Sequence, residues 1–163
     1  MAGGMIAEEV AWDHAAREDL ETPAVVPGKA AKVFRYVTPD LKQPKGIVTL
    51  CKSDILLGAV QVGAKGGENN LHSHAGMDGF WFVLRGKARF YGAGDVLLGE
   101  FGPFEGVFLP RGVAYWFESA GEELLELLQV EAFAKGVKNS RTDVEPKKAG
   151  QVKFQVFKPG ASS

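Results

Sequence analysis

The chain has 163 residues, of which 45% are hydrophobic and 24% are charged, and its formal net charge is −1. This length and composition predict one globular domain with its own core. The balanced, interspersed charge argues against nucleic-acid-binding and membrane-binding surfaces, so we expect no partner of either kind. Twenty-one glycines and eight prolines along the chain indicate many turns and short strands.

Residues 1–31 are predicted to form an N-terminal arm. Small residues and acids dominate its first part, and Pro23 and Pro27 mark a loop. It shows neither a basic start nor a long apolar segment, so we expect no signal peptide and no membrane span. Cys51 is the only cysteine, which excludes an intramolecular disulfide. These features together predict a cytoplasmic protein.

From residue 32 onward, short apolar or alternating runs are separated by glycine, proline or Gly-Asp. They predict strands over 32–37, 47–52, 55–62, 79–86, 87–92, 95–101, 106–110, 113–119, 123–133 and 151–157. The leucine spacing in 123–133 also fits an amphipathic helix, but a preceding glycine and an aromatic, β-branched end favour a strand. Short strands at this spacing predict an antiparallel sandwich or barrel.

We divide the chain into an arm over 1–31, a barrel over 32–133 and a C-terminal part over 134–163. Within that last part, residues 136–150 are polar and predict a loop. The alternating run at 151–157 predicts a final strand, and the residues after it predict a disordered tail.

His72 and His74 are separated by one residue, so both imidazoles lie on the same face of an extended strand. Imidazole nitrogens bind transition metals, and two neighbouring rings supply half of a metal site. A His-x-His pair without chemical function is the alternative.

Two segments resemble the motifs of the cupin superfamily, whose members are small jelly-roll β-barrels. In the first motif, Gly66 is followed by His72 and His74, and Gly86 closes the next strand. In the second, residues 110–112 (Pro-Arg-Gly) match the motif's turn. The resemblance covers roughly residues 32–133. It implies an all-β, cupin-type jelly-roll barrel of antiparallel strands.

The resemblance also implies a metal site, from which this sequence departs. It places a metal-binding glutamate at Gly79 and a third histidine at Tyr115. Asp78 precedes the glutamate position and would turn inward only through a bulge or an irregular loop. The expected metal ligands are therefore His72, His74, Tyr115 and, with such a distortion, Asp78. The expected cofactor is a divalent transition metal, with iron, manganese, zinc, nickel and copper all open, and a hydrogen-bonded, non-ligating Tyr115 is the alternative.

The inward face of the barrel predicts a ligand pocket. Strand parity places Trp81 on the same face as Gly79, and Phe117 on the face of Tyr115, so Trp81 and Phe117 are predicted to bind substrate. Aromatic side chains that only fill a small barrel are the alternative. A glycine in place of the glutamate predicts extra room for a ligand.

Two further features concern the remaining faces. Glu126 and Gln129 have opposite parity on their strand, so only one of them can face the interior. Phe80, Phe82 and Trp116 have outward parity and need cover. Cupins commonly dimerise through such faces, so the resemblance implies a homodimer.

The motifs together predict a single-domain cupin that binds a small oxygenated or aromatic metabolite. With a metal, His72, His74 and Tyr115 are the expected catalytic residues of an oxygenase-type enzyme, with isomerase and lyase next. The alternative is a non-catalytic ligand-binding cupin with a degenerate metal site.

Overall fold

The computed structural model of the protein describes residues 30–65, 68–146 and 154–159. The chain divides into two compact units, Met1–Val33 and Phe34–Ser163. Of the first unit only residues 30–33 are described, so the predicted N-terminal arm lies almost wholly outside the described residues. Most of the predicted C-terminal tail lies outside them too, and the boundaries at residues 31/32 and 133/134 stay predictions.

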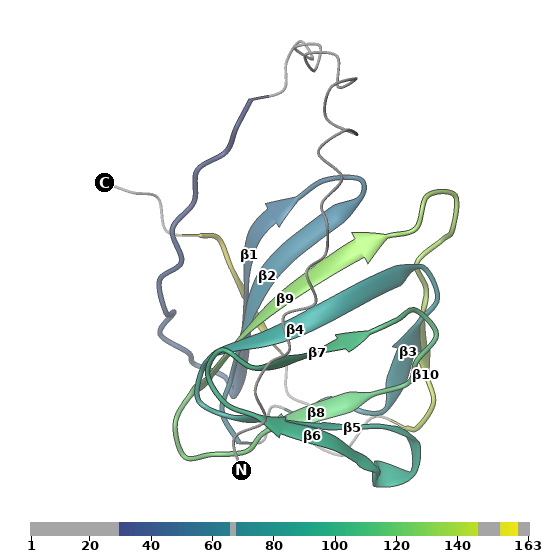
Figure 1. The fold of residues 1–163 in the computed structure, drawn as a ribbon. Helices are drawn as coiled ribbons and strands as arrows, with labels where there is room; N and C mark the ends of the chain where they lie inside the picture. The colour runs from purple at the N-terminus through teal and green to yellow at the C-terminus, as the bar shows by residue number, and fades with distance from the viewer. Residues whose placement is uncertain (1–29, 66–67, 147–153, 160–163) are drawn as a thin grey trace, which may run out of the picture. The chain divides into compact units, whose positions relative to one another are not determined.

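The larger sheet has six strands in the order β11-β1-β2-β9-β4-β7 (Figure 1). Its strands are β1 (Lys45–Lys52), β2 (Leu56–Gly63), β4 (Met77–Arg85), β7 (Gly106–Leu109), β9 (Leu125–Phe133) and β11 (Gln155–Phe157). The prediction of a strand over 123–133 is confirmed, since β9 lies in the middle of this sheet between β2 and β4. Its two neighbours explain its buried leucines.

Two smaller sheets complete the fold. One has the order β6-β5-β8 and comprises β5 (Ala88–Tyr91), β6 (Leu97–Phe101) and β8 (Trp116–Ser119), with the 3-10 turn η2 (Ala93–Asp95) before β6. The other pairs β3 (His72–His74) with β10 (Arg141–Asp143). Both lie opposite the larger sheet in Figure 1. The predicted all-β jelly-roll class is confirmed. Among the described residues, no helix is long and apolar enough to cross a membrane.

Strand β11 pairs with β1 in parallel, whereas the other strand pairs of the described residues are antiparallel. Two local predictions were wrong. No strand spans 32–37, where the only extended pairing is a single bridge residue, Arg35. The predicted loop at 136–150 contains β10, three exposed residues that pair with β3. Their sequence, Arg-Thr-Asp, carries no apolar alternation that would have indicated a strand.

Aromatic side chains from three strands form the centre of the core. The Trp81 ring lies 6.2 Å from that of Phe90, and the Phe90 ring stacks on that of Phe117 at 5.0 Å. Val83 and Leu127, both fully buried, pack in the same cluster. We call Trp81, Phe90 and Phe117 the aromatic core.

The predicted outward residues differ in how far they are covered. Phe80 is 43% exposed, as its parity predicts, but Trp116 is only 7% exposed. The Trp116 ring stacks on Tyr91 at 4.2 Å, and its Nε1–H donates to Asp95 at 2.8 Å. Trp116 therefore gives no support to an uncovered face.

Candidate functional site

A cavity of about 330 Å³ lies between the larger sheet and the β3–β10 pair. Its walls come from β1, β2, β3, β9 and β10 and from the loops before β3 and β8. The lining residues are Lys45, Ile47, Thr49, Leu57, Ala59, Gln61, Glu68, Asn69, His72, His74, Tyr115, Gln129, Glu131, Arg141 and Phe154. His72, His74 and Tyr115 thus share one enclosure.

His72 is held in one orientation. It forms a β-bridge with Tyr115, with backbone hydrogen bonds of 3.1 and 2.9 Å. Its ring lies 4.7 Å from the Tyr115 ring and 5.1 Å from the His74 ring. Its Nδ1–H donates to the Asn70 carbonyl at 2.7 Å. A carbonyl only accepts, so Nδ1 carries the proton and Nε2 is left as an acceptor.

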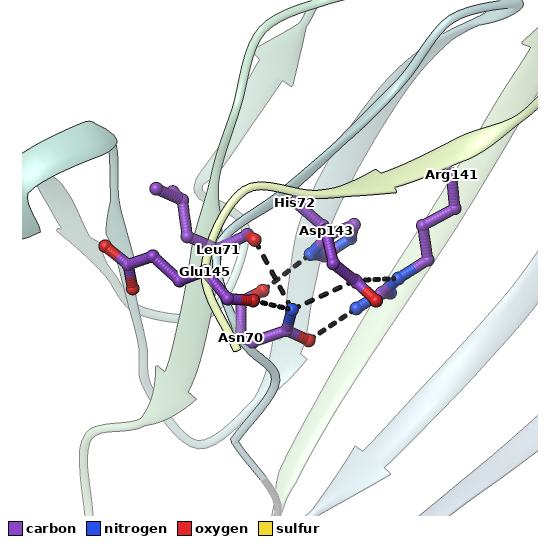
Figure 2. Close-up of polar contacts among 6 residues, drawn as sticks. All are labelled: Asn70, Leu71, His72, Arg141, Asp143 and Glu145. Atoms are coloured by element: carbon purple, nitrogen blue, oxygen red, sulfur yellow. Dashed lines mark hydrogen bonds and ion pairs between the residues drawn. The ribbon is translucent and has the colours of Figure 1, made fainter. Parts of the chain in front are cut away.

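Asn70 fixes this part of the wall (Figure 2). Its side chain is fully buried, and its Nδ2 donates to Asp143 at 2.9 Å and to the Glu145 carbonyl at 3.0 Å. Its Oδ1 accepts a 2.6 Å bond from Arg141, whose Nε also donates to Asp143 at 2.8 Å. Asn70 therefore connects the two residues: its backbone carbonyl binds the His72 ring, and its side-chain amide binds the Arg141 guanidinium.

The electrostatics favour neutral rings. Burial lowers the pKa of His72 to about 4, with Arg141 and His74 contributing. Burial, and then Arg141, lowers the pKa of His74. Burial raises the pKa of Tyr115 well above its ordinary value, and the charge of Glu131 adds to this. At neutral pH the three groups are two neutral imidazoles and a neutral phenol.

Gly79, where the resemblance places the metal-binding glutamate, leaves no vacant space. A Cβ built there would lie 2.9 Å from two atoms of the Trp81 indole. Real Cβ atoms are essentially never that close, so the indole occupies the room of the missing side chain. The prediction of extra space for a ligand was wrong.

Trp81 and Phe117 do not line the cavity, contrary to the sequence prediction. Trp81 is 1% exposed and Phe117 is 5% exposed, and both belong to the aromatic core. Parity placed them inside the barrel, but it could not distinguish packed interior from cavity wall.

Asp78 also lies elsewhere. The register of β4 on β9 is regular from Met77 to Val83, so Asp78 points to the face opposite Gly79. Its carboxylate accepts a 2.9 Å bond from the backbone N–H of Arg111 and pairs with that guanidinium at 3.3 Å. The bulge that would have turned it inward is not present at this end of β4.

Two residues of β9 contribute polar groups that the sequence reading only partly found. Gln129 lines the cavity, whereas Glu126 points away and accepts a hydrogen bond from Thr38. Glu131 follows with the parity of Gln129, lines the cavity and is directly opposite Gly79 in the register. Burial raises its pKa. The sequence signal for Glu131 was parity: every second residue of 125–133 faces the same side, so Glu131 faces the side of Gln129.

Two cations complete the wall. Lys45 at the start of β1 has its pKa lowered to about 8, mainly by burial and then by Arg141, while Glu68 opposes the shift. Among the described residues, its ammonium has no ion pair or hydrogen bond, and its contact is with the Phe117 ring, 5.0 Å from the centroid. Arg141 is anchored as described above.

These donors do not fit a resident catalytic metal. The described part of the chain contains no group of three or more His, Cys, Asp or Glu side chains placed to hold an ion. Two imidazoles are present, but the third donor, Tyr115, would have to lose a proton that its surroundings retain. The carboxylate opposite the expected glutamate position, Glu131, is hydrogen-bonded by Gln129.

Comparison with known proteins agrees with this fold. No protein-family model and no curated protein sequence matches the chain. An uncharacterized conserved protein with a double-stranded β-helix domain from Klebsiella pneumoniae matches 72% of this chain and 100% of its own, at 16% identity and a TM-score of 0.58. KdgF from Halomonas sp. matches over 65% and 97%, at 12% identity and a TM-score of 0.54. The cupin domain of Cnp3 from Schizosaccharomyces pombe matches over 59% and 69%, at 18% identity and a TM-score of 0.52.

At these identities the likeness concerns the fold. The order of strands, the position of the histidine pair and the three structures all agree with the resemblance inferred from the two motifs. The chain has the double-stranded β-helix fold of the cupin superfamily.

Proposed function

We propose that the protein binds a small polar organic molecule in the cavity bordered by His72, His74 and Tyr115. The observation that carries this is the convergence of polar side chains from five strands on one cavity of about 330 Å³. Small-molecule sites have this character, with a few placed polar groups in a preformed pocket, and this volume is at the small end of their range.

Neutral imidazole and phenol groups suit such a role. The Nε2 of His72 can accept a hydrogen bond, and a neutral Tyr115 can donate one. With or without catalysis, these groups would orient a ligand without requiring a charge inside the barrel. We therefore favour a ligand-binding cupin whose metal site is degenerate.

A metal-dependent oxygenase, isomerase or lyase is the second candidate. It is favoured by one observation, the free Nε2 of His72 beside the His74 ring. The donor set argues against it for the reasons given above. Metal analysis of protein purified without chelators separates the two candidates. A stoichiometric transition metal that His72→Ala removes would overturn the metal-free assignment.

The binding function itself is tested by filling the cavity. Ala59 lies on β2, is 2% exposed and lines the cavity, so Ala59→Phe places a ring inside it. Ala132→Phe on the exposed side of β9 is the matched control. Native mass spectrometry and calorimetry should show ligand binding in the wild type and in Ala132→Phe but not in Ala59→Phe. Equal binding by both variants would place the ligand site elsewhere.

The predicted homodimer and cytoplasmic location stay predictions. Phe80 on β4 lies opposite Phe108 on β7, and these side chains are 43% and 62% exposed. Light scattering of the purified protein measures the oligomeric state directly.

A further inference from the structure

The cavity contains a chain of hydrogen bonds with a fixed direction. Gln61 Nε2 donates to Gln129 Oε1, and Gln129 Nε2 donates to Glu131 Oε1. A carboxylate only accepts, so Glu131 requires the amide NH₂ of Gln129 to point toward it. That leaves the Gln129 carbonyl for Gln61, which must in turn present its own NH₂. The side-chain oxygen of Gln61, Oε1, is then left without a partner in this series of hydrogen bonds.

This oxygen is buried without a partner. Five buried side-chain atoms in the described part of the chain lack a hydrogen bond, and among them only Gln61 Oε1 belongs to a residue that lines the cavity of about 330 Å³. Gln61 is 9% exposed. Leaving such an acceptor unsatisfied is costly, so the site requires a donor that the described protein does not provide.

Lys45 supplies a second group without a polar partner in the described part of the chain, a positively charged donor close to the unpartnered oxygen of Gln61. In the register of β1 on β2, Lys45 is opposite Gly63, so its side chain is on the face of Gln61 and diagonal to it. Its ammonium forms no ion pair among the described residues, although the charge of Glu68 acts on it. Arg141 lines the same space, although Asp143 and Asn70 already bind part of its guanidinium.

We infer that the ligand is a small hydroxylated carboxylic acid, whose carboxylate lies against the Lys45 ammonium while a hydroxyl group donates to Gln61 Oε1. The inference rests on the proposed binding function and names the ligand class. Glu131 does not need to touch the ligand, because it acts by setting the direction of the amide chain through Gln129. Glu68 and Glu131 add negative charge to the wall, so a ligand carboxylate is best accommodated against the Lys45 ammonium.

The test uses five four-carbon probes in calorimetric titrations at pH 7. Succinate, L-malate and tartrate have two carboxylates and carry no, one and two hydroxyl groups. The remaining two probes are 1,4-butanediol, which has hydroxyl groups but no charge, and 1,4-diaminobutane, which carries positive charge. L-malate should bind at least about tenfold more tightly than succinate, as expected when a buried acceptor gains its partner. The diol and the diamine should bind more weakly than either acid.

Variants assign the two contacts. Gln61→Leu should bring L-malate to the affinity of succinate and leave succinate within about threefold. Lys45→Met should weaken both acids by more than about tenfold. Lys65→Met, which removes an exposed lysine paired with Glu122, is the matched control and should change neither. Circular dichroism tests whether each variant is folded. If Gln61→Leu is not folded, the ratio of the wild-type affinities for L-malate and succinate and the result for Lys45→Met still test the inference.

The outcomes distinguish the inferred ligand class from the proposed binding function. Equal binding of succinate and L-malate, or preferred binding of the diol or the diamine, overturns the inference and leaves the binding function standing. If none of the five probes binds, the inference is overturned, and the comparison of Ala59→Phe with Ala132→Phe decides whether the binding function is overturned with it.

Discussion

The barrel interior has two regions that the sequence alone made indistinguishable. The aromatic core is apolar and buried, whereas the cavity beside it is lined by histidine, amide, lysine and carboxyl groups. Tyr115 contacts both, with its ring 4.9 Å from Trp81 and 4.7 Å from His72. The difference shows that the expected glutamate position, at Gly79, is filled by the Trp81 indole, whereas the histidine pair faces a polar cavity whose other groups come from β1, β2, β9 and β10.

The largest effect should follow from emptying the aromatic core. Trp81→Ala removes a 1% exposed indole that fills the space at Gly79, and we expect a loss of about 3–5 kcal/mol in the free energy of unfolding. Urea denaturation measures it. Phe80→Ala changes the adjacent, 43% exposed residue on the other face and should cost about 1 kcal/mol or less. Equal losses for the two variants would mean that Trp81 is not the filler of the core.

The second prediction concerns the boundary between the two regions. The pKa of His72 is lowered to about 4, so the unfolded chain takes up a proton there before the folded protein does. Stability should therefore fall as the pH decreases from about 6.5 to about 4. We expect a loss of about 2 kcal/mol, less than the full shift corresponds to, because the ring borders the cavity.

His72→Gln provides the control for this dependence, since an amide can still donate to the Asn70 carbonyl but does not titrate. Denaturation at a series of pH values should give a flatter profile for the variant. An unchanged acid dependence would assign the effect to other groups.

Much of the fold could be predicted because it follows from local pattern. Alternation and turn residues located β1, β2, β4 to β9 and the residues of β11, and the two motifs indicated the double-stranded β-helix fold. The two histidines and Tyr115 were brought together as expected. What failed depends on contacts distant in sequence. The parallel pairing of β11 and the three-residue β10 are set by their partners β1 and β3.

The candidate site shows the same limit at the level of single residues. Parity placed Trp81 on the inner face correctly but could not show that its indole turns back over Gly79. The orphan oxygen of Gln61 likewise depends on the direction of a chain that runs from β2 to β9. Neither arrangement can be predicted from the amino-acid composition or from the spacing of residues in the sequence.

The third prediction concerns Lys45 in the polar cavity. The free protein's Lys45 has a pKa lowered to about 8, and an anionic ligand should bind its protonated form. L-malate affinity should therefore be constant from pH 7 to about 8 and then fall by up to about tenfold per pH unit, as measured by calorimetry. Lys45→Met should bind weakly without this dependence, and a wild-type affinity that is flat to pH 10 would remove Lys45 from the site.

The smallest effect is expected outside both regions, at Asp78. Its side chain is 36% exposed and pairs with Arg111 on the surface. Asp78→Asn keeps an oxygen that can accept the Arg111 backbone N–H, so only a partly exposed ion pair is lost and stability should change by about 0.5 kcal/mol or less. Affinity for L-malate and transition-metal content should match the wild type. A metal present in the wild type and lost in this variant would show that β4 rearranges in solution to turn Asp78 inward, which would reverse the division between packed and polar sides described above.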